Sequence, residues 1–122
     1  MTFPNINYKF NDLPEAQALT ALVEQKCASF EKYLHGKGSA VCDVEFEKVA
    51  PAQNGQVHRL EVNLQIDGVL YRAEATEESF EKAIDEVRDE LDAELRKAKE
   101  KQETKDKQSG RAAKEQMMEA SV

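Results

Sequence analysis

Residues 58–75 contain a β-hairpin signature that constrains the fold more than any other part of the chain. From Leu60 to Ile66 apolar residues alternate with polar ones, which is the two-residue period of a half-buried strand. Asp67 and Gly68 follow, and both residue types accept the positive φ angles of a type I′ turn. The hairpin therefore has one apolar face and one polar face. An uncovered polar sheet face favours contact with a large partner over a pocket for a small molecule.

A long charged helix is predicted directly after the hairpin. Thr76 is its expected N-cap, and Glu77 and Glu78 would complement the helix dipole. The apolar residues recur at helical spacing: Phe80, Ala83, Ile84, Val87, Leu91, Leu95 and Ala98. The apolar pattern stops beyond about Lys101. Residues 102–122 are therefore predicted to be a frayed helix end and a disordered tail.

A strand, a helix and a second strand are predicted upstream of the hairpin. Residues 5–10 alternate as a short strand, and Asn11 or Asp12 is the expected N-cap of a helix that runs to about Leu34. Residues 41–49 alternate again. The order is β-α-β-β-β-α, which places the chain in the α+β class. Because each helix has one apolar face, both should pack on one face of a four-stranded mixed sheet whose first two strands are parallel.

Length and composition indicate one domain, over residues 1–101, since 122 residues leave little room for a second. No apolar run approaches the roughly 18 residues of a membrane span, and the N-terminus does not resemble a signal peptide. We therefore expect a cytoplasmic protein with no membrane partner. Cys27 and Cys42 have neither the number nor the spacing of a disulfide framework or zinc site. They are expected to be free buried thiols, and no metal is predicted.

The sequence offers no clear catalytic residues. His35 and His58 are the only histidines, and neither has a Cys or Ser partner nearby in sequence. The segment 36–39 (GKGS) lacks the spacing of a phosphate-binding loop and follows a helix instead of a strand. The carboxylates lie at solvating spacing on exposed faces. We predict that the protein is not an enzyme and has neither cofactor nor small-molecule substrate.

The charge of the chain is unevenly distributed. The formal net charge is −7, which argues against an indiscriminate nucleic-acid binder. Residues 1–95 hold 9 Lys and Arg against 19 Asp and Glu, whereas residues 96–122 hold 8 against 5. Basic residues at a helix C-terminus complement its dipole, but this does not explain their continuation past residue 101. Positive charge is therefore concentrated at the end of the last helix and in the tail.

Three segments carry a likeness to a known family. VEQKCASFEKYL at 23–34 is similar to the family's first helix, and the hairpin at 58–75 to its central hairpin. SFEKAIDEVRDELDAELRK at 79–97 is similar to its second helix, with Ala-Ile-Asp, leucines every fourth residue and terminal lysines. Together they resemble the ribosome hibernation promoting factor family, also called ribosome-associated inhibitors or ribosome-subunit interface proteins, in its short single-domain form. The resemblance covers roughly residues 5–101.

The resemblance implies a βαβββα domain like a double-stranded-RNA-binding domain with an added strand. It implies binding to the small ribosomal subunit, on ribosomal RNA near the tRNA and mRNA sites. It also implies inhibition of translation under stress or slow growth. In this family basic side chains meet RNA phosphates. Lys26 and Lys32 match basic positions of the family's first helix. The full set of predicted RNA-binding residues is Lys9, Lys26, Lys32, Arg59, Arg72, Arg88, Arg96, Lys97, Lys99 and Lys101.

The chain departs from the family pattern along one edge of the second helix. The family's basic edge falls here on Glu90, Ala93, Lys97 and Lys101, of which only the last two are basic. Each lost phosphate contact lowers affinity and salt dependence, although the basic run from Arg96 to Lys114 could compensate. The competing hypothesis is a domain of the same fold that binds a protein partner through its acidic faces. Convergence of the basic residues on one face would favour RNA, and their separation by acidic residues would favour protein.

Overall fold

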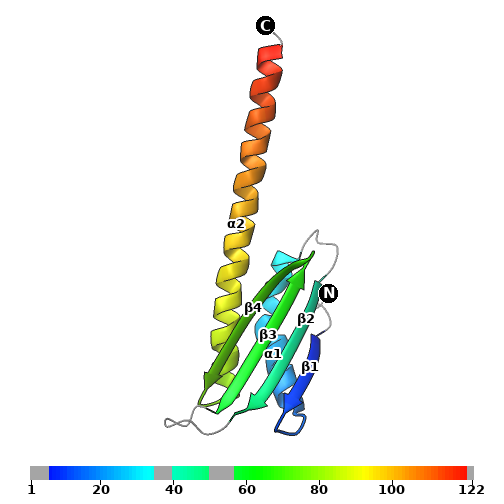
Figure 1. Cartoon of the computed structure of the whole chain (residues 1–122), viewed down its shortest axis with the longest axis vertical. Helices are drawn as coiled ribbons and strands as arrows, with labels where there is room; N and C mark the ends of the chain where they lie inside the picture. Colours follow the sequence, from blue (N-terminus) through cyan, green and yellow to red (C-terminus); the bar gives the residue numbers. More distant parts are fainter. Residues whose placement is uncertain (1–5, 35–39, 50–56, 121–122) are drawn as a thin grey trace.

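The computed structural model describes residues 6–34, 40–49 and 57–120, with side chains as far as Lys105. The predicted β-α-β-β-β-α order is confirmed (Figure 1). The elements are strand β1 (Ile6–Asn11), helix α1 (Gln17–Cys27), the 3₁₀ helix η1 (Ala28–Tyr33), strands β2 (Ala40–Lys48), β3 (His58–Ile66) and β4 (Val69–Glu77), and helix α2 (Phe80–Ala120).

The four strands form one mixed sheet in the order β1-β2-β3-β4. β1 and β2 are parallel, and α1 supplies the crossover that parallel neighbours require. The other pairs are antiparallel. The β3–β4 hairpin closes at Ile66 and Val69, and the turn residues Asp67 and Gly68 have φ angles of 47° and 84°. Both angles are positive, as the two-residue turn predicted from the sequence requires.

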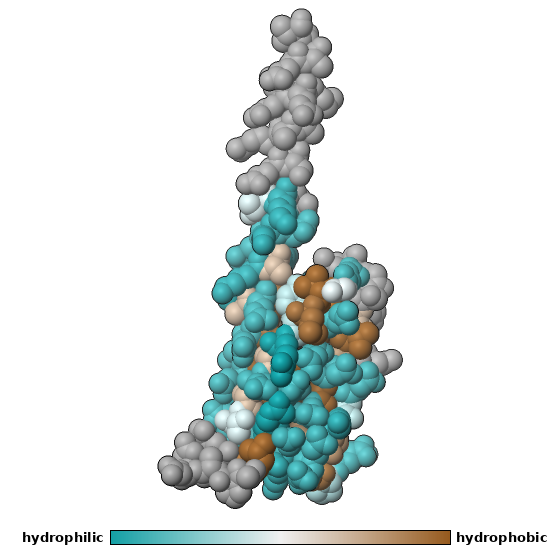
Figure 2. Space-filling model, viewed as in Figure 1, coloured by the Kyte–Doolittle hydropathy of each residue, from teal (hydrophilic) through white to brown (hydrophobic). Residues whose placement is uncertain are grey.

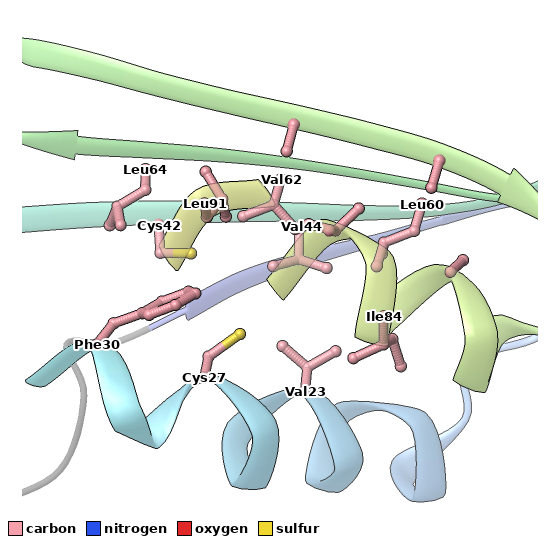
Figure 3. Close-up of a cluster of buried hydrophobic side chains, with 14 of the residues drawn as sticks. Val23, Cys27, Phe30, Cys42, Val44, Leu60, Val62, Leu64, Ile84 and Leu91 are labelled. Atoms are coloured by element: carbon pink, nitrogen blue, oxygen red, sulfur yellow. The ribbon is translucent and has the colours of Figure 1, made fainter. Parts of the chain in front are cut away.

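Both helices cover the same face of the sheet, as predicted, and their apolar sides share one core with it (Figures 1 and 3). Val23 and Phe30 enter this core from α1 and η1, and Leu91 enters it from α2 and is 0% exposed. Cys27 and Cys42 are free and buried, as expected. Burial raises the pKa of the Cys27 thiol to about 11 and that of Cys42 to about 12.

The helix starts differ from the sequence prediction. Asn11 is the last residue of β1, and Asp12 has φ 60°, so neither caps a helix. α1 begins after Ala16, which makes no side-chain capping hydrogen bond, and it gives way to the 3₁₀ geometry of η1 from Ala28. Thr76 was also wrong as an N-cap because β4 extends to Glu77.

Ser79 is the residue that caps α2. Its Oγ accepts a hydrogen bond from the backbone N–H of Lys82 at 3.2 Å. The sequence predicts the end of this helix near Lys101, but the structure extends it to Ala120, past the sheet (Figure 1). The added stretch contains no Pro and one Gly, and its many Lys, Gln, Glu and Ala residues are good helix formers. The mobility of residues 102–122 stays a prediction.

Residues 35–39, which include His35 and the GKGS segment, and residues 50–56 lie outside the described residues. Among the helices that the structure describes, none combines the length and the apolar character of a membrane span.

Candidate functional site

The sheet face opposite the helices is uncovered and largely hydrophilic (Figure 2). Strand alternation and register bring polar side chains of all four strands onto this open face. It carries more acidic than basic groups. Its carboxylates are Asp43, Glu45, Glu47, Glu61 and Glu74, and its cations are Lys9, Arg59 and Arg72.

Arg59 connects three strands of the open face. Its guanidinium lies 3.2 Å from the Glu45 carboxylate, 2.5 Å from that of Glu61 and 2.6 Å from that of Glu74. Partial burial opposes the charged form, but hydrogen bonds to Glu74 and Glu61 outweigh it and raise the pKa of Arg59. The Arg59 side chain is only 20% exposed. Its charge is therefore taken up by the protein's own carboxylates.

The other two cations of the open face also have acidic partners. Arg72 lies 3.4 Å from Glu61 and 3.5 Å from Glu74, and Lys9 lies 3.6 Å from Glu45. This face therefore offers RNA phosphates no surplus of positive charge.

A second group of candidate cations lies between the two helices. Lys26 of α1 is 2.7 Å from Asp85 of α2, and this contact is the main cause of the lowered Asp85 pKa. Arg88 lies 2.9 Å from Asp89 and 3.8 Å from Asp85. A shallow hollow of about 520 Å³ opens here. It is lined by Gln25, Lys26, Ser29, Arg88, Asp89 and Asp92.

The remaining candidate cations have no acidic partner among the described residues. Lys32 lies over the Tyr33 ring, with Nζ 5.1 Å from its centroid. The other four are exposed on α2 directly after Leu95, the last buried residue of that helix in the described part. They are Arg96, Lys97, Lys99 and Lys101.

The structure thus separates the ten predicted RNA-binding residues. The cations of the open face lie on the opposite side of the sheet from those of the helices, and carboxylates accompany both groups. Of these ten, only those of the α2 cluster, from Arg96 to Lys101, form a group of several cations without acidic partners in the described part of the chain. Sequence reasoning missed the acidic partners, since Lys26 and Asp85 are far apart along the chain.

His58 occupies a structural position. Its Nδ1 lies 3.3 Å from the backbone oxygen of Glu77, and its ring packs edge-on against Phe80. No group of three or more His, Cys, Asp or Glu residues in the described ranges is placed to hold a metal ion.

Comparisons with known proteins agree with this architecture. The family model described as Sigma 54 modulation protein / S30EA ribosomal protein matches residues 6–103. A search of curated proteins gives no match. The Thermus thermophilus Protein Y N-terminal domain superposes with a TM-score of 0.63 at 24% identity, over 76% of this chain and 97% of that one.

A ribosomal subunit interface protein from Coxiella burnetii gives a TM-score of 0.55 at 19% identity, over 77% of this chain and 96% of that one. At such identities the two superpositions establish a shared fold. The family model spans nearly all of the folded body, from β1 into α2. The chain belongs to the Sigma 54 modulation protein / S30EA ribosomal protein family.

Proposed function

We propose that this protein is a ribosome-associated hibernation factor of the cytoplasm. It binds the small ribosomal subunit, on ribosomal RNA near the tRNA and mRNA sites, and inhibits translation under stress or slow growth. Membership of a family described as containing ribosomal proteins supports association with the ribosome. The similar Coxiella burnetii protein, described as a ribosomal subunit interface protein, supports it too.

The observation that carries this proposal is the α2 cluster, the exposed cations Arg96, Lys97, Lys99 and Lys101. Cations without acidic partners release counterions from RNA when they meet phosphates, whereas cations already paired with carboxylates contribute little. Five of the other six candidates have carboxylate partners. The α2 cluster is therefore the best electrostatic anchor on the described surface.

The position of the α2 cluster also determines which part of the protein approaches RNA. The chain carries a net charge of −7, and its open sheet face is acidic, so most of the surface is repelled by RNA. Arg96 and Lys99 lie on the edge of α2 that faces α1, and Lys97 and Lys101 lie on the other edge. Positive charge around most of the helix suits contacts to phosphates, which position a protein without reading sequence.

Co-sedimentation with ribosomes at two salt concentrations tests the proposal. The wild-type chain should co-sediment with the small subunit, and Lys97→Glu with Lys101→Glu should weaken this binding. The matched control is Lys48→Glu with Lys82→Glu, which changes the net charge equally at exposed positions outside the anchor. If the chain does not co-sediment even at low salt, or both double variants lose binding equally, the proposal is wrong.

The acidic open face favours a second candidate function, a domain of this fold that binds a protein partner. Its carboxylates outnumber its cations, and acidic residues separate the cations of the two faces. The same experiment separates the two functions, because a protein-binding domain of this kind would not depend on Lys97 and Lys101. Loss of ribosome binding altogether would make the protein-partner function the leading one.

A further inference from the structure

Along one edge of α2, the acidic residues form one block and the basic residues form another. This outer edge of α2 comprises Glu86, Glu90, Glu94, Lys97, Lys101 and Lys105, which fall within about 100° of one another on a helical wheel. The first three are acidic and the last three are basic. Glu94 is half-buried and the other five are exposed. None of the six forms an ion pair with another residue of the described part.

The outer edge points away from α1. Contacts to α1 and η1 come from the other side of α2, where Lys26 meets Asp85 and the Tyr33 hydroxyl donates a hydrogen bond to Asp92 at 3.2 Å. The outer edge instead adjoins β4, since Glu86 interacts with Glu77 at the end of that strand. β4 is the last strand of the sheet order and has no strand on its outer side among the described residues. The outer edge of α2 therefore lies on the side of the free edge of β4, and Figure 1 shows the helix and the strand close together where β4 ends and diverging toward the start of β4.

Within one chain this charge arrangement is unfavourable. Glu86, Glu90 and Glu94 follow one another at i,i+4 spacing, as do Lys97, Lys101 and Lys105, and like charges at this spacing destabilise a helix. The pKa of Glu86 is raised, first by its hydrogen bond with the Glu77 carboxyl and further by burial and by repulsion from Glu77 and Glu90. Within this edge, opposite charges are neighbours only at Glu94 and Lys97, so most of the repulsion inside each block is not offset.

We propose that two copies of this chain form a symmetric dimer in which the outer edges of α2 pair antiparallel. The spacing of the six residues is the same in both directions, whereas the sign of their charge is reversed. In the antiparallel pair Glu86 faces the partner's Lys105, Glu90 faces the partner's Lys101 and Glu94 faces the partner's Lys97. Twofold symmetry forms each pair twice. A parallel pair would place like charges opposite one another.

An exposed apolar residue, Val69, lies at the start of β4. Its side chain is 54% exposed and belongs to the helix-covered face of the sheet, where Val69 pairs with Ile66, whereas the next residue, Leu70, points to the open face. β4 rises about 26 Å from Val69 to Glu77, which equals roughly 18 residues of the returning helix. Val69 is therefore level with the segment from Leu95 to Lys97, where the charge changes sign. An apolar centre with a charged rim is the usual anatomy of a protein interface.

Dimerisation would cover Lys97 and Lys101, which belong to the α2 cluster. The dimer and the RNA-bound form would then exclude each other. The dimer itself does not depend on the proposed function, because its test contains no RNA. A failure of the dimer proposal can therefore be distinguished from a failure of the proposed ribosome binding.

Sedimentation equilibrium of the full chain tests the dimer at roughly 20 mM and 500 mM salt, across a range of protein concentrations. The wild-type chain should dimerise at low salt and dissociate at high salt. One variant reverses the acidic block (Glu86, Glu90 and Glu94 to Lys), and another reverses the basic block (Lys97, Lys101 and Lys105 to Glu). Each exposed ion pair contributes little by itself, but the contributions of six pairs add up. Losing all six pairs should therefore raise the dissociation constant of the dimer roughly a hundredfold.

An equimolar mixture of the two block variants should associate again, because one then presents only cations and the other only carboxylates. The matched control is Arg96→Glu with Lys99→Glu, on the edge facing α1, which should leave dimerisation unchanged. Val69→Asp should weaken the dimer from its centre. All these sites except the half-buried Glu94 are exposed, and circular dichroism should be used to verify that each variant is folded. A wild-type chain that stays monomeric at low salt, a dimer that survives either block reversal, or a mixture that fails to associate would overturn the proposal.

Discussion

Replacing Arg59 with Gln would test whether this residue supports the fold or is available to RNA. In the structure its guanidinium contacts Glu45, Glu61 and Glu74 on three different strands. The substitution removes the positive charge and leaves three carboxylates close together. We expect the variant to be less stable than the wild type at neutral pH and to keep its ribosome binding.

The magnitude follows from the exposure of the partners. The side chains of Glu45 and Glu61 are 27% and 18% exposed, so each of their hydrogen bonds to Arg59 should contribute on the order of 1 kcal/mol. Glu74 is 49% exposed, and solvent screening makes its share small. The expected loss at pH 7 is therefore about 1–3 kcal/mol of unfolding free energy.

The loss should depend on pH in a defined direction. The pKa of Glu61 is lowered in the folded state, first by the hydrogen bond from Asn63 and also by Arg59 and Arg72, although burial opposes this. A lowered carboxyl pKa contributes stability above its unfolded value of about 4.3, and that stability is lost as the pH falls through the folded value. The difference between wild type and variant should therefore be large at pH 7 and should shrink below about pH 4.

Urea unfolding followed by far-ultraviolet circular dichroism at roughly pH 7 and pH 3.5 measures this difference. The matched control is Arg72→Gln, because Arg72 is 57% exposed and lies 3.4 Å and 3.5 Å from Glu61 and Glu74. Its loss should stay below about 0.5 kcal/mol. An Arg59 variant with a loss that small at pH 7, or with an equal loss at both pH values, would refute the argument. Arg59 would then be a better candidate for RNA contact than the structure indicates.

Four further predictions concern the core, the anchor and the helix end. Leu91→Ala should lower the unfolding free energy by roughly 2–5 kcal/mol, since this residue is 0% exposed, and a loss below about 0.5 kcal/mol in urea would mean that the core face of α2 is misassigned. Lys97→Glu with Lys101→Glu should reduce the slope of ribosome affinity against salt by nearly one unit per lost phosphate contact, and an unchanged slope would place the RNA anchor elsewhere. Glu90→Lys should strengthen ribosome binding in the same titration, because it adds a cation beside the anchor; weaker binding would contradict this. Truncation after Lys105 should leave the melting temperature nearly unchanged, because α2 has by then left the sheet, and a large drop would show that the removed segment docks on the domain.

The elements whose signals are local could be predicted from the sequence. The turn at Asp67 and Gly68 and the alternation on either side fixed the hairpin, and the apolar spacing through Leu91 identified the core face of α2. The helix starts were mistaken because several residues could act as caps. Thr76 and Ser79 are both favoured N-cap residue types, and the choice between them depends on how far β4 pairs with β3.

The candidate site could be predicted only in part, because ion pairing across strands and helices is a tertiary property. A basic residue alone gives no sign of whether a carboxylate will lie beside it. The contact between Arg59 and Glu45 can be predicted only if the register of β2 and β3 is known. The contact between Lys26 and Asp85 can be predicted only if the packing of α1 on α2 is known. The cluster from Arg96 to Lys101 could be recognised in advance, because its positive charge is contiguous along one helix.

The buried pair Cys27 and Cys42 gives this fold an internal chemical reporter. Only thiolates react with alkylating reagents, and burial raises the two pKa values to about 11 and about 12 while shielding the sulfur atoms from solvent. Modification at neutral pH therefore requires the core to open. The rate of alkylation measures how often the sheet separates from its helices, and it can do so in a cell extract or on a ribosome, where spectroscopic melting is impractical.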